Sequence, residues 1–557
     1  MTEFLFRMSE VDLAARLAEL SHSNGSLEPE PLRQACEARL LMAQGKFDEA
    51  LQPLQAATDA ARSLCASSAE GKFLWIGFLC DVGADLAATL DYLGDVPGAE
   101  GMYNELLALR PNGVFLGDYA KFLHRRKRDF VQAEAFYVRA LQLFPQQSSI
   151  HLKYAGFLRH VKKDLKAADA AYRKAIEADK THADAIGAYA SFLHGVMGKA
   201  ELAEELYVEA VRLDGTHANN LCNYGLFLSE EKAQYAAAEK LYLRALAHSP
   251  KHANTLYNYA VMLDTHVGGG SRKAEAEGLY RRALVVEPRH AFCLYNLAVL
   301  LEDKVLAAER LQDRTTVKEQ GGLTPGMEAA RAAARGEVGS LYERAVECDP
   351  RDATAVADYG RYLLTRMLDA DAAEKQLFAA LQLDGENAVA QYNMALLLHK
   401  HRSSLSGAEG LLTRLTNKSV KHAAALQQLA RVLLDKFRAS GDDRDLEACF
   451  TTFHKAADAM RADPSMCLLE YLKVVLDVGS GRQRRRAVGF VEEVLGAADA
   501  SGRKVGRHAD VRGMIEAVKV LGNQKTKAQA QSQSQTQTQT QTQTQTQTQE
   551  LESDVPL

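Results

Sequence analysis

The sequence lacks several features that would narrow its class. Its 557 residues include one Trp, 12 Pro and eight Cys, and no CxxC pair occurs. Isolated Cys argue against a zinc ribbon or a disulfide framework and favour a reducing compartment. No apolar run reaches the roughly 18 residues that a membrane-spanning helix needs. The N-terminal segment has charged residues where a signal peptide would have an unbroken apolar core. We expect a soluble cytoplasmic protein, with a nuclear location left open, and no membrane partner.

Neither positive nor negative charge is in large excess. The formal net charge is -5, which gives no support to general nucleic-acid binding, so nucleic acid is not expected as a partner. Apolar residues make up 47% of the chain, enough for a substantial core. We therefore expect a folded protein built from ordinary apolar packing.

A repeat is present instead. A large apolar residue followed by a small one recurs in steps of 35, 35, 35, 35, 38, 62, 35 and 35 residues. The "GGG" at 268–270 accounts for the step of 38, and an insertion at about 303–336 accounts for the step of 62. The pairs are Tyr119–Ala120, Tyr154–Ala155, Tyr189–Ala190, Tyr224–Gly225, Tyr259–Ala260, Leu297–Ala298, Tyr359–Gly360, Met394–Ala395 and Leu429–Ala430.

Each period contains two helical patterns. Leu221, Tyr224, Gly225 and Leu228 follow the i, i+3, i+4, i+7 spacing of one helical face. A second apolar stripe follows and ends near a Pro, such as Pro250, which cannot continue a helix. The sequence therefore predicts an all-α solenoid of stacked antiparallel helix pairs, with about nine clear repeats and divergent N-terminal repeats.

Small and aromatic residues of the second helices recur at fixed phases. Ala lets neighbouring helices approach closely, and a Tyr fills the space between successive pairs, which stabilises the fold by about 2 kcal/mol per buried ring. The predicted packing residues are Tyr137, Tyr172, Tyr207, Tyr242, Tyr280, Tyr342, Ala140, Ala175, Ala210, Ala245, Ala283 and Ala345.

The order of small and aromatic residues resembles the tetratricopeptide (TPR) repeat over most of residues 113–460. Leu294, Leu297, Ala298 and Leu301 match the first helix of that signature, although the period here is 35 residues and Tyr often takes the core position, in a "YAxFL" form. The resemblance implies a right-handed solenoid that presents its first helices on a concave face. "GKFDEALQPLQAA" (45–57) and "GAEGMYNELLALRP" (98–111) look like fainter second helices.

These patterns divide the chain into four parts. Residues 1–112 are a divergent TPR-like region, 113–460 are the solenoid with the insertion at about 303–336, and 461–522 are capping helices. Within the insertion, "MEAARAAARGEV" is expected to extend the second helix, and "KEQGGLTPG" is expected to be mobile. Residues 523–557 alternate Gln with Ser or Thr, carry few apolar residues and are expected to be disordered.

An Asn precedes the core residue of several first helices. The TPR resemblance places this phase on the concave face, where an amide can both donate to and accept from a partner's backbone. Several such bonds are needed, because each contributes only about 0.5–1.5 kcal/mol. An alternative is that these Asn are exposed and have no role. The predicted groove residues are Asn223, Asn258, Asn296, Asn393, Tyr257, Tyr295 and Tyr392.

The leading functional hypothesis is a non-enzymatic scaffold that binds extended segments of a protein partner in its groove. Some TPR domains clamp an acidic chain end with basic first-helix residues, but at those phases this chain has residues such as Gly187, Cys222, Ser191 and Leu226. The "YxRA" at 137–140 also resembles half-a-TPR repeats of RNA-processing scaffolds, yet their expected Arg is replaced by acids such as Glu134. A further alternative is an accessory subunit of an enzyme complex.

No catalytic, cofactor or metal motif is found. His182, His217, His252 and His290 recur at one phase, but residues one repeat apart are too far from each other to share a metal, so they are expected at the turns that enter the first helices. Two basic clusters, "HRRKR" (124–128) and "GRQRRRA" (481–487), are candidates for phosphate contact or nuclear import, or are solvated turns. We expect no metal and no cofactor.

Overall fold

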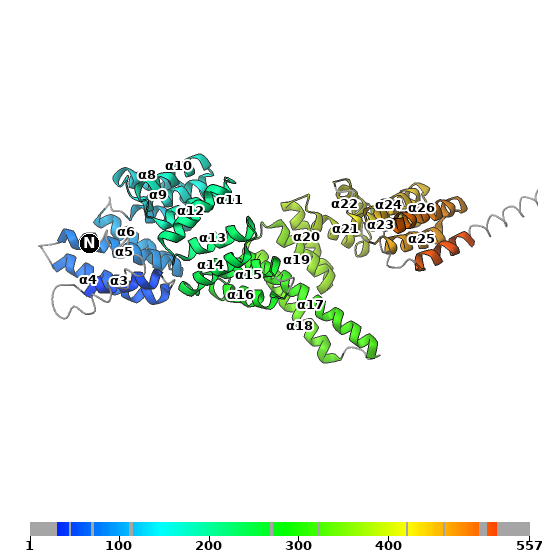
Figure 1. Cartoon of the computed structure of the whole chain (residues 1–557), viewed down its shortest axis with the longest axis horizontal. Coiled ribbons are helices and arrows are strands. Elements are labelled where there is room, and N and C mark those ends of the chain that lie inside the picture. The colour runs from blue at the N-terminus through cyan, green and yellow to red at the C-terminus, as the bar shows by residue number, and fades with distance from the viewer. Residues whose placement is uncertain are drawn as a thin grey trace, which may run out of the picture. The chain divides into compact units, whose positions relative to one another are not determined.

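The structure, a computed structural model, describes residues 30–520 except 44–45, 68–71, 111–114, 268–270, 320–323, 419–421, 461–462 and 501–508. These residues form helices and no strand (Figure 1). Helices that follow one another in the chain pack as pairs, for example α11 (Ala183–Gly195) against α12 (Ala200–Leu213). The predicted all-α repeat fold is confirmed. The expected disorder of residues 523–557 lies outside the described residues.

The predicted repeats correspond to successive helix pairs, in three of which a π-helical turn (η) ends the first helix. The pairs are α7 (Leu116–Phe122) with η1 (Leu123–Lys127) and α8 (Phe130–Leu143); α9 (Ser148–Phe157) with η2 (Leu158–Lys162) and α10 (Leu165–Ala178); α11 and α12; α13 (Ala218–Glu230) and α14 (Tyr235–His248); α15 (Ala253–Thr265) and α16 (Lys273–Val286); α17 (Ala291–Glu319) and α18 (Pro325–Cys348); α19 (Ala353–Tyr362) with η4 (Leu363–Met367) and α20 (Ala370–Leu383); α21 (Ala388–Lys400) and α22 (Leu405–Lys418); α23 (Ala423–Ser440) and α24 (Asp443–Ala459).

Further helices precede and follow these pairs. α3 (Glu30–Ala43) packs on α4 (Phe47–Ser67), and α5 (Lys72–Leu93) on α6 (Val96–Leu109). The two helices expected from the fainter N-terminal copies are therefore present as α4 and α6. In the C-terminal part, α25 (Ser465–Val478) and α26 (Gly481–Ala500) share a core with α24.

The chain divides into two compact units, residues 1–300 and 301–557. Inside the first unit each first helix also contacts the next first helix, from α5 and α7 through α9, α11 and α13 to α15. The second unit repeats this arrangement with α19, α21 and α23. Contacts between equivalent helices of adjacent pairs are what make each unit a stack.

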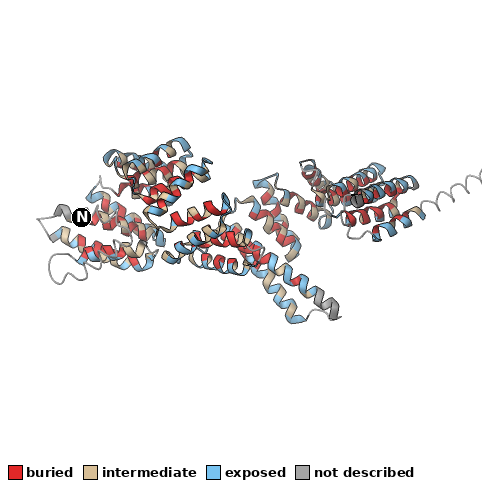
Figure 2. Cartoon of the chain, in the orientation of Figure 1, coloured by how far each residue is buried: buried red, intermediate tan, exposed pale blue. Residues whose placement is uncertain are grey.

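The seams between pairs contain a regular aromatic contact. In the first unit the ring of Tyr207 lies 5.7 Å from Tyr224 and 5.6 Å from Phe227 of the following first helix. The same offset of 17 residues brings Tyr242 within 5.7 Å of Tyr259. The second-helix Tyr side chains are buried, at 0–3% exposed, and the Ala one turn later are 0–2% exposed. Buried residues recur along the helices of the chain (Figure 2). The constant offset of 17 residues between the two rings fixes the spacing from each second helix to the next first helix, which is one part of the regular 35-residue step.

Side chains at the helix ends explain why each pair begins and ends where it does. Asp129 and Asp164 cap α8 and α10, where each carboxylate accepts a hydrogen bond from a backbone N–H of the first turn, 2.9 Å away. Arg128 and Lys163 precede these caps with left-handed φ angles of 57° and 58°. The left-handed residue reverses the chain direction after the π-helical turn.

The insertion forms a helical hairpin rather than a loop. α18 extends back to Pro325, which confirms the expected extension of the second helix, but α17 also extends, to Glu319. The prediction that the insertion extends the second helix was therefore incomplete, because the first helix is extended as well. Of "KEQGGLTPG", residues 320–323 lie outside the described residues.

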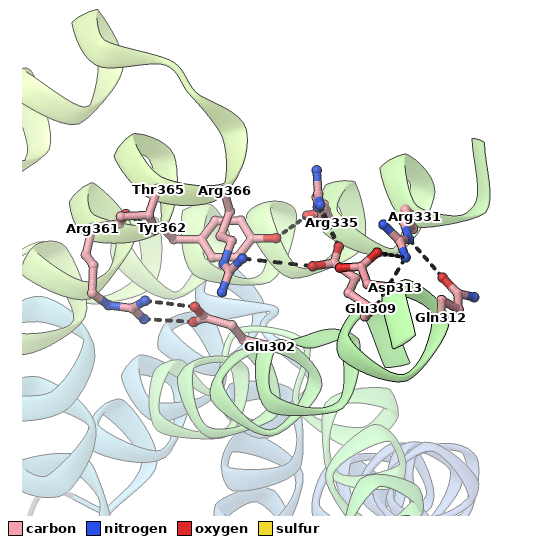
Figure 3. A network of polar contacts seen from close by, with 10 residues as sticks. All are labelled: Glu302, Glu309, Gln312, Asp313, Arg331, Arg335, Arg361, Tyr362, Thr365 and Arg366. Carbon is pink, nitrogen blue, oxygen red and sulfur yellow. Dashed lines mark hydrogen bonds and ion pairs between the residues drawn. The ribbon is translucent and has the colours of Figure 1, made fainter. Parts of the chain in front are cut away.

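Ion pairs tie this hairpin to the next repeat within the second unit (Figure 3). Arg361 donates two hydrogen bonds of 2.8 Å to the buried Glu302 of α17. Glu309, also buried, accepts from Arg335 of α18 at 2.8 Å. Tyr362 donates to the Arg335 carbonyl at 2.7 Å. The base of the hairpin is therefore held by polar contacts.

Candidate functional site

The predicted groove residues of the first unit are half-buried and mostly bonded within the chain. Asn258 donates to the Cys222 sulfur at 3.4 Å, and Asn296 donates to the Tyr257 hydroxyl at 3.1 Å. Each of these bonds joins one first helix to the preceding one. Asn223 is half-buried, and its amide has no hydrogen-bond partner among the described residues. Two of the three amides therefore link repeats.

The remaining predicted groove residues are similarly engaged. Asn393, 5% exposed, donates to the Val389 carbonyl of its own helix at 2.8 Å. The Tyr392 ring lies 5.9 Å from His422, and the Tyr257 ring lies 4.8 Å from His290. Tyr295 is half-buried. A grip of these amides on a partner's backbone stays a prediction, and it would require Asn258, Asn296 and Asn393 to exchange their internal bonds.

A hollow of about 850 Å³ opens instead on the first helices α7, α9 and α11 of the first unit. Its lining includes Lys121, Arg125, Arg128, Lys153, His160 and Asp184. We refer to it as the α7–α11 hollow. Leu152, Lys153 and Ala188 of the lining occupy the same repeat phases as the predicted groove residues, one or more periods upstream. The predicted groove residues themselves lie in later repeats and do not line the hollow.

Positive charge dominates the α7–α11 hollow. Lys153 pairs with Asp118 at 2.6 Å, whereas Lys121, Arg125 and Arg128 are exposed and form no ion pair with any described residue. Lys121 as a whole residue is exposed, but burial of its ammonium by the surrounding protein lowers its pKa, and the charge of Lys153 lowers that pKa further. Cations crowded in a concave surface favour the arrival of a negative group.

Histidines add little positive charge to this hollow near neutral pH. Burial lowers the pKa of His124 to about 4, although its hydrogen bond to the Ala120 carbonyl has the opposite effect. Burial likewise lowers the pKa of His160, and nearby Arg159 contributes. Both rings are therefore neutral at pH 7, and the charge of the hollow comes from Lys and Arg.

The "HRRKR" cluster is divided by the η1 turn. Arg126 and Lys127 pair with Asp91 of α5 and Glu100 of α6, at 2.5 Å and 2.9 Å. Arg125 and Arg128 instead line the hollow. The turn thus places two cations in inter-repeat ion pairs and two in the lining of the hollow. In the other cluster, Arg484 is buried and donates to the Leu476 carbonyl at 3.0 Å, which is a structural contact.

Sequence reasoning missed Lys121 and Lys153 as site residues. The signal was available, since Lys121 lies two 35-residue periods before Ser191, and Lys153 lies two periods before Asn223. Extending the clamp phase of Ser191 and the groove phase of Asn223 into the first two repeats would have found both. The contribution of Arg128 depends on the left-handed turn and could not be read from spacing.

The recurring His lie where the sequence predicted. His182, His217 and His252 are the residues that precede α11, α13 and α15, and the last two accept a backbone N–H of the first turn. Within the described residues, no group of His, Cys, Asp or Glu is arranged to hold a metal ion. In the same residues, no helix combines the length and apolar character needed to cross a bilayer.

No family model matches this chain, and no curated protein matches it significantly. Solved structures similar to it include a human IFIT1 dimer with m7Gppp-AAAA, at 14% identity over 88% of this chain and 94% of that chain, with a TM-score of 0.41. A human IFIT1 dimer with PPP-AAAA is 16% identical over 84% and 94%, with a TM-score of 0.38. Pseudomonas aeruginosa pilF is 20% identical over 45% and 97%, with a TM-score of 0.34.

Proposed function

We propose that this chain is a non-enzymatic scaffold that binds a protein partner through the α7–α11 hollow. The observation that supports the proposal is the hollow itself, which is wide enough at about 850 Å³ to enclose several side chains of a partner. Its apolar lining, with Phe130, Leu152 and Val161, offers surface that a partner can cover. Rigid, stacked helix pairs hold these residues in place before the partner arrives.

The lining contains a position where the hollow can be filled without disturbing the fold. A Cβ built on Gly156 of α9 meets no heavy atom within 4 Å. Gly278 of α16 is equally open and lies outside the lining. Replacing a helical Gly raises helix propensity by up to about 1 kcal/mol, so neither change should unfold the protein.

The test compares Gly156→Trp with Gly278→Trp in affinity capture from cells that make the protein, followed by identification of the captured proteins. We expect the parent and Gly278→Trp to retain the same partner and Gly156→Trp to lose it, with and without ribonuclease. Equal capture by all three proteins would contradict binding at the hollow. Loss of the parent's capture after ribonuclease treatment would favour the RNA-processing alternative.

A further inference from the structure

We infer that the α7–α11 hollow accepts an acidic segment of the partner, one that carries Asp or Glu side chains between apolar ones. This inference rests on the proposed function and specifies the chemistry of the partner. Three observations support it: an excess of cations in the hollow, the apolar surface between them, and the shortage of exposed rings on which bases could stack.

The first observation is that the hollow contains positively charged side chains that form no ion pair. Four Lys or Arg residues line the hollow, against the single carboxylate of Asp184. Lys153 is neutralised by Asp118, but Lys121, Arg125 and Arg128 have no ion-pair partner among the described residues. Arg126 and Lys127 of the same segment do have carboxylate partners. Within this segment, the unpaired cations are therefore those that line the hollow.

The second observation is the apolar surface that accompanies these cations. Phe130 is 39% exposed, and Leu152 and Val161 are half-buried. The hollow is also far larger than a single phosphate or carboxylate needs. An occupant that matches both features has carboxylates for the cations and apolar side chains for the surface between them.

The third observation argues against single-stranded nucleic acid. Such ligands are held by stacking bases on exposed aromatic rings beside basic residues. The Phe157 ring of the lining is 0% exposed, which leaves the partly exposed Phe130 and the imidazole of His160 as the exposed rings of the lining. The observations favour an acidic peptide.

Direct binding to the full-length chain tests the inference. The probe is a fluorescein-labelled ten-residue peptide that alternates Glu and Leu, and its control has Gln in place of Glu. Lys121→Glu/Arg125→Glu removes two unpaired cations of the hollow. Lys166→Glu/Lys174→Glu, on exposed positions of α10 outside the lining, gives the same net charge. We expect at least tenfold weaker peptide binding for the first pair, about 1.4 kcal/mol, and less than about twofold change for the second.

Folding and alternative ligands are controlled in the same experiment. Thermal melts followed by circular dichroism check that each variant is folded. If Lys121→Glu/Arg125→Glu melts at a lower temperature than the parent, the single exposed change Arg125→Gln replaces it and is expected to weaken binding severalfold. Failure of the parent to bind the Glu peptide, equal binding of the Gln peptide, or preferential binding of fluorescein-labelled oligo(A) RNA would each overturn the inference. If Gly156→Trp loses partner capture but the charge-reversed variant keeps it, the inference that the bound segment is acidic is overturned. The proposed function would then remain intact.

Discussion

The distance between paired helices depends on single small residues, and Gly225 shows this most directly. A Cβ on Gly225 would lie 2.9 Å from Cε1 of Tyr242, a ring that is fully buried between α13 and α14. Sterics, rather than backbone conformation, therefore require glycine at this position. The sequence pattern of a small residue after each core aromatic has its physical cause in this close approach.

We predict that Gly225→Ala lowers the free energy of unfolding by about 1–3 kcal/mol, because the buried ring has to move to admit the methyl group. Gly278→Ala is the matched control, since nothing lies within 4 Å of its Cβ, and it should stabilise by about 0.5–1 kcal/mol through helix propensity. Urea denaturation followed by circular dichroism measures both. Shifts of the same sign would show that helix propensity, not contact with Tyr242, decides the outcome.

At the scale of elements, the hairpin of α17 and α18 depends on the buried Glu302. Burial alone raises the pKa of Glu302, but the hydrogen bonds and charge of Arg361, with a hydrogen bond from Tyr342, outweigh it and lower the pKa below its usual value. A carboxylate whose folded pKa is lowered stabilises the fold fully above the unfolded pKa of about 4.3 and loses that contribution as the pH falls through the folded pKa.

Replacing Arg361 by Gln should reverse this dependence. Without Arg361, Glu302 loses its bidentate partner, so burial becomes the dominant influence and the pKa of Glu302 rises. The charged form of Glu302 then destabilises the hairpin as the pH increases. We predict a loss of about 3–5 kcal/mol at pH 7 that shrinks toward pH 4.5, where Glu302 can take up a proton. Urea midpoints at the two pH values measure it, with the exposed Arg351→Gln as control. A loss that does not vary with pH would mean that Glu302 remains charged without Arg361.

Much of each element could be predicted from sequence, because the 35-residue period is set by contacts that recur in every pair. Tyr242 and Tyr259 are one example of a ring contact at a constant offset. The length of α17 could not be predicted, since its extension makes polar contacts with residues farther along the chain, such as Glu309 with Arg335 and Asp313 with Arg331. The acids such as Glu134 that replaced the expected Arg also have a structural explanation, since Glu134 pairs with Lys162 of the next repeat at 2.9 Å.

For the whole molecule, some residues of the hollow occupy the repeat phases singled out in the sequence, but the sequence did not indicate which repeats form the hollow. The phase of Asn223 is occupied by Lys153 in the hollow, and the amides at this phase in later repeats bond to neighbouring side chains or to their own helix. A periodic pattern assigns the same role to every copy. The local charge, and whether a side chain already has a partner inside the fold, distinguish one copy from another.

Nearest-neighbour stacking also limits how far a disturbance can travel. The helix pairs of each unit contact the pairs that precede and follow them, so stability is approximately a sum of repeat and interface contributions. We therefore predict that Gly225→Ala accelerates backbone hydrogen exchange in α11 to α16 and leaves α23 to α26 at parental rates. Hydrogen exchange measured by mass spectrometry tests this prediction. Gly278→Ala is the control, because it is expected to slow backbone hydrogen exchange in its own repeat. Equal acceleration of hydrogen exchange in α23 to α26 would mean that the chain unfolds as one cooperative body. It would contradict the view that stability is a sum of repeat and interface contributions.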